Sequence, residues 1–212
     1  YTYVFSRKLV ELADKDEKIV AISAAMPSGT GLNRMAERFP DRFFDVGIAE
    51  EHAVTFAAGM ASKGMKPVVA IYSTFFQRAY DQILHDVCIG RLPVIFAVDR
   101  AGLVGSDGET HQGMFDISYF NSMPNMTIMA PKNVLELEKM LEFAAGFDGP
   151  IAIRYPRGKA YTGLKEYDTK IEYGKSEKIT DGVDIALLAV GSMGVGSNRM
   201  NIYTVGAATQ GL

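Results

Sequence analysis

The sequence predicts a doubly wound α/β fold, with a mostly parallel sheet of about six strands and helices on both faces. Short, nearly continuous apolar runs alternate with longer amphipathic stretches along the first 160 residues. A parallel strand covered on both faces has this unbroken apolar pattern, because neither of its sides meets water. The chain has 212 residues, of which 48% are hydrophobic, enough for one sizeable core.

The strands are expected, in chain order, at residues 18–23, 43–46, 67–72, 93–98, 126–130 and 150–155. Four helix-length stretches lie between them, at residues 3–15, 49–64, 75–90 and 133–147. Asn133 opens the last of these and suits an N-cap, because its side-chain oxygen can accept a hydrogen bond from a free backbone N–H. Strands and helices therefore alternate as in a series of βαβ units.

The pattern changes after Tyr161. Residues 162–183 are polar, rich in Lys, Glu and Gly, and without helical periodicity, which indicates a linker. An apolar strand then begins near Asp184 and ends at Gly191 and Ser192, as the start of a second α/β unit would. Residues 184–212 are too few for a core of their own. We therefore expect one complete domain over residues 1–161 and a partial α/β segment at the C-terminal end.

Composition excludes several classes of function. With 22 basic and 25 acidic side chains the net charge is -3, which argues against a grip on nucleic acid or on anionic lipid. Cys88 is the single cysteine, so there is no disulfide framework, and a reducing compartment such as the cytoplasm is expected. No apolar stretch approaches the roughly 18 residues that span a membrane, and no secretory signal is visible.

In an open parallel sheet, ligands bind beyond the carboxyl ends of the strands. The segments expected there carry polar, aromatic and glycine residues, at positions 26–29, 47–50, 72–75, 99–102 and 154–158. No spacing typical of a complete metal site or of a nucleophile elbow occurs in the chain. The sequence therefore predicts a ligand site at this edge, and no pattern in it points to a complete metal site.

Glu50 and Glu51 open the predicted helix at residues 49–64, whose continuation is small and apolar. Acidic residues in a first turn complement the helix dipole, which is one sufficient explanation for both. The second explanation is chemical, because a carboxyl group at the mouth of a buried helix can share a proton with a ring nitrogen of a bound heterocycle. The residue pattern alone leaves both open.

Residues 102–113 form a long loop with four glycines and a histidine, His111. Such loops inside a compact domain are often functional, although a solvated turn has the same composition. His111 lies near Asp107 in the sequence and suits a general acid or base, an anion donor, or an ordinary surface histidine.

Aromatic and cationic side chains complete the candidate set. Tyr72 and Phe75 stand at a strand-to-helix junction with Arg78 one turn on, where they serve either as core or as a platform for a flat ligand. Arg100 and Arg157 follow strands at the same edge, and a guanidinium group there suits a phosphate or carboxylate as well as a surface salt bridge.

Several separate blocks also agree, in order and spacing, with one enzyme family. They are DVGIAEEHAVTFAAG at 45–59, YSTFFQRAYDQ at 72–82, DRAG at 99–102, DG at 107–108, THQG at 110–113 and RYPRG at 154–158. Residues 1 to about 160 resemble the central, pyrimidine-binding domain of the 1-deoxy-D-xylulose-5-phosphate synthase family, thiamine-diphosphate enzymes related to transketolase. The resemblance implies a transferase that decarboxylates pyruvate and joins the remaining two carbons to D-glyceraldehyde 3-phosphate. Its products would be CO2 and 1-deoxy-D-xylulose 5-phosphate, which feeds isoprenoid, thiamine and pyridoxal biosynthesis.

The resemblance also implies roles for individual residues. Glu50 matches the glutamate that hydrogen-bonds N1′ of the aminopyrimidine, and Phe75 matches the aromatic residue that stacks on that ring. Ile48, Tyr72 and Arg78 would complete the cofactor contacts.

On the substrate side, Tyr72, Asp107 and His111 would line the channel, with His111 as the catalytic proton donor or anion partner. Arg100 and Arg157 would hold the phosphate of the aldehyde acceptor.

Two departures limit the resemblance. The family carries diphosphate and Mg2+ on an N-terminal domain with a GDG motif followed by Asn. This sequence lacks that motif. The chain is therefore expected to supply only the pyrimidine half of the site and to need that domain as partner. The resemblance ends from Gly194 onward. A homodimer is expected from the family. The alternatives are the C-terminal subunit or a fragment of a split transketolase, and a noncatalytic fragment that serves subunit association.

Overall fold

The computed structural model describes residues 1–181, 186–195 and 201–204. Its main sheet has six strands, which are β1 (Ile19–Ser23), β2 (Phe43–Asp45), β3 (Lys66–Tyr72), β4 (Ile95–Asp99), β5 (Thr127–Met129) and β6 (Ile151–Arg154). All neighbouring strands pair in parallel, in the order β2-β1-β3-β4-β6-β5. The predicted sheet and its parallel character are confirmed.

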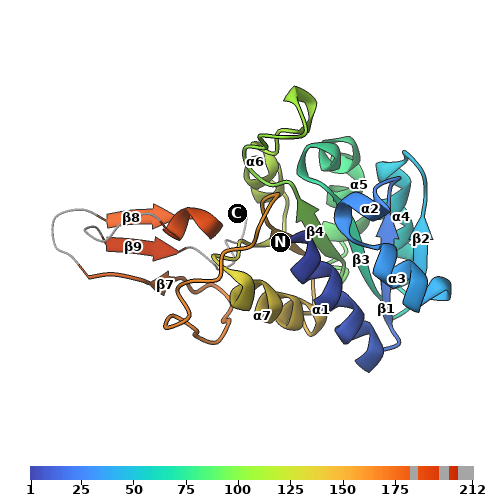
Figure 1. Ribbon diagram of the computed structural model, residues 1–212. Helices are drawn as coiled ribbons and strands as arrows, with labels where there is room; N and C mark the ends of the chain where they lie inside the picture. Colours follow the sequence, from blue (N-terminus) through green and yellow to red (C-terminus); the bar gives the residue numbers. More distant parts are fainter. Residues whose placement is uncertain (182–185, 196–200, 205–212) are drawn as a thin grey trace.

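Helices cover both faces of this sheet (Figure 1). One face packs against α1 (Thr2–Lys15), α3 (Asn33–Arg38) and α7 (Val134–Ala145), and the other against α4 (Glu50–Ala61), α6 (Asp116–Asn121) and the helical stretch 73–88. Consecutive strand residues alternate between the two cores, so that Ala70 faces the first and Ile71 the second. Both faces of the central strands are buried, which explains their unbroken apolar runs.

Three of the four predicted helices are confirmed as α1, α4 and α7. The predicted N-cap of α7 is also confirmed, because the side chain of Asn133 accepts a hydrogen bond from the backbone N of Glu136 at 2.9 Å. A short helix, α2 (Pro27–Thr30), and α3 follow β1 in a stretch for which the sequence indicated no helix.

The predicted helix-length stretch at residues 75–90 is helical over residues 73–88, but it is not a regular α-helix. The stretch begins as a 3₁₀ helix, η2 (Ser73–Ala79), continues in α5 (Tyr80–Gln82) and ends in a π-helical turn, η3 (Ile83–Cys88). The buried residues of η2 are spaced by three, at Ser73, Phe76 and Ala79, which matches three residues per turn. This winding buries Phe76 in the core and leaves Phe75 at the edge of the sheet.

The chain beyond Tyr161 runs along α7 without forming a helix up to residue 181. Lys132 binds Glu177 at 2.6 Å, and Lys139 binds Asp168 at 2.7 Å. A small sheet of β7 (Glu177–Lys178), β9 (Asn201–Thr204) and β8 (Ala186–Ala189) lies to one side of the main sheet (Figure 1).

The strand predicted from near Asp184 is present as β8. Asp184 itself lies outside the described residues. A 3₁₀ turn, η5 (Gly191–Val195), follows β8. The division into a domain at 1–161, a linker at 162–183 and a segment at 184–212 stays a prediction.

Candidate active site

The candidate residues gather at the carboxyl edge of the main sheet. They lie at or after the ends of four strands. Ile48 and Glu50 follow β2, Tyr72 ends β3 and Phe75 and Arg78 follow it, Arg100, Asp107 and His111 follow β4, and Arg157 follows β6. From Glu50 to Arg157 they form one continuous series of contacts. Ile48 lies two residues before Glu50 with 79% of its surface exposed.

Glu50 is the first residue of α4, and its side chain is only 2% exposed. Its Oε1 atom accepts a hydrogen bond from Nη1 of Arg78 at 2.5 Å. The free N–H groups of a helix start favour a negative charge at this place. Glu51, by contrast, is exposed. The two acids of this first turn therefore differ, and only Glu50 is a buried carboxylate facing the site.

A row of rings continues from Arg78. Its guanidinium lies 4.6 Å from the centre of the Phe75 ring, which makes an edge contact with His111 at 5.3 Å between ring centres. Tyr72 lies 6.0 Å from Phe75 and 5.9 Å from His111 by the same measure. Phe75 is thus a partly exposed aromatic residue that packs against the core and is linked to the buried carboxylate through Arg78.

Tyr72 joins this row to a charged network. The guanidinium of Arg100 lies 4.0 Å from the centre of the Tyr72 ring, a cation–π contact. Burial raises the pKa of the Tyr72 hydroxyl, and the positive charge of Arg100 acts in the opposite direction. The hydroxyl therefore keeps its proton through the neutral range.

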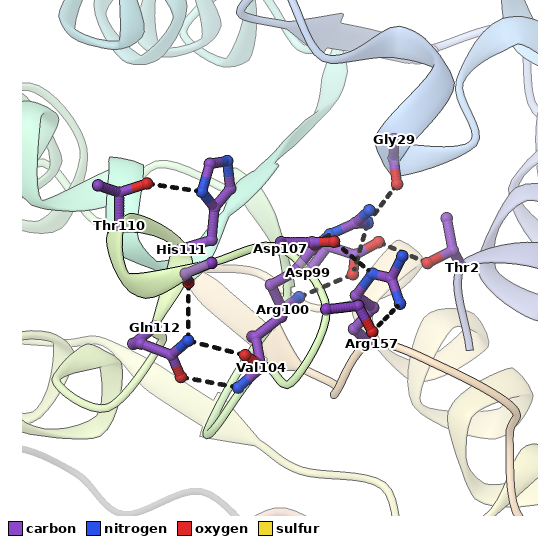
Figure 2. A network of polar contacts seen from close by, with 12 residues as sticks. Thr2, Gly29, Asp99, Arg100, Val104, Asp107, Thr110, His111, Gln112 and Arg157 are labelled. Atoms are coloured by element: carbon purple, nitrogen blue, oxygen red, sulfur yellow. Dashed lines mark hydrogen bonds and ion pairs between the residues drawn. The ribbon is translucent and has the colours of Figure 1, made fainter.

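Asp107 bridges two arginines (Figure 2). Its Oδ2 atom lies 3.1 Å from Nε of Arg100, and its Oδ1 atom lies 2.8 Å from Nε of Arg157. Arg157 also donates to the hydroxyl of Ser106 at 3.1 Å. Two guanidinium groups that converge on one carboxylate are arranged to bind an anion with oxygen acceptors, such as a phosphate.

The loop that carries Asp107 and His111 is closed on itself. Gly102 and Gly113 form an antiparallel bridge at its base, with hydrogen bonds of 2.7 and 2.9 Å. The side chain of Gln112 spans the loop and bonds both the backbone N and O of Val104, at 2.8 and 2.7 Å. His111 stands at the end of a 3₁₀ turn, η4 (Glu109–His111), where its Nδ1 lies 2.9 Å from the hydroxyl of Thr110. The loop is therefore held in a defined conformation by its own hydrogen bonds. Its glycine content alone did not distinguish this from a solvated turn.

Two supporting contacts link residues that are far apart in the sequence. Thr2 donates to Asp99 at 2.7 Å across 97 positions of the chain, and Arg100 donates to the carbonyl oxygen of Gly29. A Cβ on Gly29 would lie 1.6 Å from the Tyr72 hydroxyl oxygen, so a larger residue there would require the Tyr72 side chain to shift. No local pattern marks Thr2, and the position of Gly29 after a strand did not reveal its contact with Arg100, since both act through the folded arrangement.

Two observations concern the described residues as a set. They contain no group of three or more His, Cys, Asp and Glu side chains arranged to hold a metal ion. None of their helices combines the length and the apolar character that crossing a membrane requires.

An all-parallel sheet with its polar cluster at the strand carboxyl ends defines a ligand-binding domain of the doubly wound α/β class. More particularly, the chain belongs to the transketolase pyrimidine-binding domain family, because residues 1–162 match the family described as "Transketolase, pyrimidine binding domain". The family resemblance seen in the sequence is thereby confirmed.

Curated relatives are similar in sequence to this chain over most of its length. The 1-deoxy-D-xylulose-5-phosphate synthase of Lachnoclostridium phytofermentans is 65% identical over 193 residues, which are 91% of this chain and 31% of that protein. The synthase of Dictyoglomus thermophilum is 60% identical over 194 residues, again 91% of this chain and 31% of the relative. The chain thus spans about a third of the length of these relatives.

Solved structures agree on the fold. A split-gene transketolase described as an inactive β4 tetramer has a TM-score of 0.84 at 26% identity, covering 97% of this chain and 70% of that one. The transketolase of Campylobacter jejuni has a TM-score of 0.82 at 20% identity, covering 96% of this chain and 35% of that one. At the latter identity the likeness concerns the fold alone.

Proposed function

We propose that this chain supplies the pyrimidine-binding part of a 1-deoxy-D-xylulose-5-phosphate synthase, a thiamine-diphosphate-dependent transferase. The observation that carries the proposal is the continuous cluster from the buried Glu50 carboxylate to the guanidinium groups of Arg100 and Arg157. Further support comes from curated relatives of 60 to 65% identity, which bear this enzyme name.

The cluster has two parts. The pyrimidine end consists of Ile48, Glu50, Phe75 and Arg78. The phosphate end consists of Arg100, Asp107 and Arg157. Tyr72 and His111 lie between the two ends, in contact with Phe75 on one side and, through Tyr72, with Arg100 on the other.

The pyrimidine end fits the aminopyrimidine ring of thiamine diphosphate. A buried carboxylate suits a ring nitrogen, the Phe75 face suits stacking, and the exposed Ile48 offers an aliphatic contact. When bound, the cofactor supplies the nucleophilic carbon and the electron sink that decarboxylation of a 2-oxo acid requires.

Each residue of the pyrimidine end has a distinct task. Glu50 holds a proton at N1′ of the ring, and the ion pair with Arg78 fixes the orientation of its carboxylate. Phe75 orients the ring, and the packing of α4 behind Glu50 excludes water from that side.

The phosphate end binds the acceptor. Arg100 and Arg157 bind the phosphate of D-glyceraldehyde 3-phosphate, in exchange for part of their present contact with Asp107. His111 contacts Phe75 and Tyr72, between the two ends, and transfers a proton to the aldehyde oxygen as the new carbon–carbon bond forms. Pyruvate is the donor.

Other parts of the proposal concern the rest of the enzyme. Mg2+ and the diphosphate are assigned to an N-terminal domain outside this chain, and the active form is a homodimer in the cytoplasm. A split transketolase subunit is the second enzyme candidate, but the solved split-gene protein is only 26% identical to this chain. A noncatalytic association fragment would leave the cluster without a task.

The test uses a complemented enzyme, which is this chain together with the parts of the Lachnoclostridium phytofermentans synthase that lie outside the matched stretch. CO2 release from labelled pyruvate is measured with thiamine diphosphate and Mg2+, with and without D-glyceraldehyde 3-phosphate. Release that rises with the aldehyde, together with formation of deoxyxylulose phosphate, supports the proposal. No release from a complex shown to have assembled would favour transketolase chemistry or the noncatalytic alternative, and turnover of ketose phosphates then separates these two.

A further inference from the structure

Asp99 is a buried charge that the proposed chemistry does not use. It is the last residue of β4, and its exposed fraction is 0%. Its Oδ1 atom accepts a hydrogen bond from the backbone N of Arg100 at 2.7 Å, and its Oδ2 atom accepts one from the Thr2 hydroxyl at 2.7 Å. A carboxylate is costly to bury, so its partners must compensate for the lost hydration.

The compensating charge is Arg100 itself. Nη1 of its guanidinium lies 3.2 Å from Oδ1 of Asp99, so this carboxylate contacts both the backbone and the side chain of the next residue. Burial raises the pKa of Asp99, while the Arg100 charge acts in the opposite direction.

The backbone of Arg100 has a conformation that needs such support. Its φ angle is +59°, in the left-handed region that residues other than glycine seldom adopt. The hydrogen bond from Arg100 N to Asp99 and the bond from Ala101 N to the Tyr155 carbonyl, at 3.0 Å, hold the chain on either side of this turn. The guanidinium lies against the Tyr72 ring and, as Figure 2 shows, beside Asp107.

We infer that Asp99 is a positioning residue for binding of the acceptor's phosphate, because it fixes both the left-handed turn and the guanidinium of Arg100. The inference rests on the proposed function for the identity of the acceptor. It predicts that Asp99 acts on the phosphorylated acceptor specifically, and not on the chemistry at the pyrimidine end.

The test compares two acceptors in the complemented enzyme, D-glyceraldehyde 3-phosphate and D-glyceraldehyde. For Asp99→Asn we expect kcat/KM to fall by about 10- to 100-fold with the phosphorylated acceptor, as for loss of a hydrogen bond to a charged group. The value for D-glyceraldehyde is expected to stay within about threefold, because no phosphate contact is lost. A merely structural role would lower both values by the same factor, and that result would overturn the inference.

Asp116→Asn is the matched control. Asp116 is 1% exposed, bonds the backbone N of the next residue at 2.8 Å, and binds Arg154 at 2.9 Å, but it lies outside the cluster. The ratio of the two kcat/KM values is expected to be unchanged in this variant. If Asp99→Asn does not fold, Thr2→Val removes one hydrogen bond to Asp99 and is expected to shift the ratio in the same direction by a smaller factor.

A second measurement separates the inference from the proposed function. Inorganic phosphate is titrated against this chain alone and followed by the phosphorus NMR linewidth. Weaker binding to the Asp99→Asn chain, with unchanged binding to Asp116→Asn, supports the positioning role even if the complemented enzyme makes no deoxyxylulose phosphate. Equal phosphate binding by Asp99→Asn and the unsubstituted chain overturns it, whatever the enzyme does.

Discussion

The two ends of the site are built in different ways. The pyrimidine end depends on one buried carboxylate, Glu50, whose partner Arg78 remains 47% exposed. The phosphate end has several charges that contact one another, with Asp107 between Arg100 and Arg157 and with Asp99 behind Arg100. A single proton position requires one well-placed acid, whereas an anion site distributes its task over several cations. Substitutions should therefore have a sharp effect at the first end and a graded effect at the second.

The largest effect is expected at the pyrimidine end. Glu50→Gln removes the group that we propose holds the proton at the ring, so kcat of the complemented enzyme should fall by about 10²- to 10⁴-fold, the range for lost acid–base catalysis. Both acceptors should be affected alike, because this end does not contact the phosphate. Steady-state rates with each acceptor provide the measurement.

Glu51→Gln is the control for this variant, since Glu51 has the same charge in the same helix turn and is exposed. It should keep nearly full activity. Equal losses in the two variants would mean that helix-start charge, and not a proton position, explains Glu50.

A smaller and more selective effect is expected at the phosphate end. Arg157→Gln removes one of the two guanidinium groups on Asp107, and kcat/KM for D-glyceraldehyde 3-phosphate should fall by about 10- to 100-fold. The value for unphosphorylated D-glyceraldehyde should change little. Lys159→Gln removes an exposed cation two residues further on and should alter neither value. A loss shared by both acceptors in Arg157→Gln would assign this arginine to the fold and not to the phosphate.

The packing around Tyr72, which lies between the two ends, can be tested through the free energy of unfolding. In Gly29→Ala the new methyl group would overlap the Tyr72 hydroxyl, so the free energy of unfolding should fall by about 1–3 kcal/mol, as for overpacking. Gly59→Ala, within α4 and with no heavy atom within 4 Å of the added carbon, should instead stabilise the chain by about 0.5–1 kcal/mol. Urea unfolding of both variants measures the difference. If Gly29→Ala and Gly59→Ala were equally stable, the Tyr72 side chain would move aside without cost, contrary to this prediction.

The smallest effect is expected away from the site, in the chemical reactivity of the buried Cys88 at the end of η3. Burial raises the pKa of this thiol to about 12 from the ordinary value of 9.0. Because the thiolate is the reactive form, iodoacetamide at pH 8.5 should modify Cys88 only after unfolding in urea, as followed by mass spectrometry.

The pH dependence has a definite sign. Between pH 9 and 12 the folded thiol keeps a proton that the unfolded thiol loses, so the stability from this group is lost as pH rises through that window. Modification of the native chain at the rate of the unfolded one would contradict the burial of Cys88 in the core that also packs against α4.

The contrast between the ends also explains what the sequence could predict. The strands were predictable because burial on both faces leaves an unbroken apolar run, and the place of Glu50 followed from a strand end and a helix start that are adjacent in the chain. The 3₁₀ winding that begins the helical stretch 73–88 could not be predicted. Its buried residues are three positions apart only when the polar Ser73 is counted, and the apolar residues alone also fit an α-helix.

At the phosphate end, Arg100 and Arg157 could be recognised as arginines after strands. The partners that orient Arg100 could not, because Gly29 lies 71 positions away and Thr2 reaches Asp99 across 97 positions. Contacts of this kind arise only when βαβ units bring separate strand ends to one edge. A single sequence therefore indicates which side chains reach the site but not what holds them in place.

The central claim is that one edge of this domain divides its task between a proton position and a phosphate position. The most direct measurement is the ratio of kcat/KM for D-glyceraldehyde 3-phosphate to that for D-glyceraldehyde, in Glu50→Gln and Arg157→Gln forms of the complemented enzyme. We predict that Glu50→Gln lowers both values and leaves the ratio unchanged, whereas Arg157→Gln lowers the ratio by about 10- to 100-fold. An unchanged ratio in Arg157→Gln, or a ratio altered by Glu50→Gln, would contradict the division.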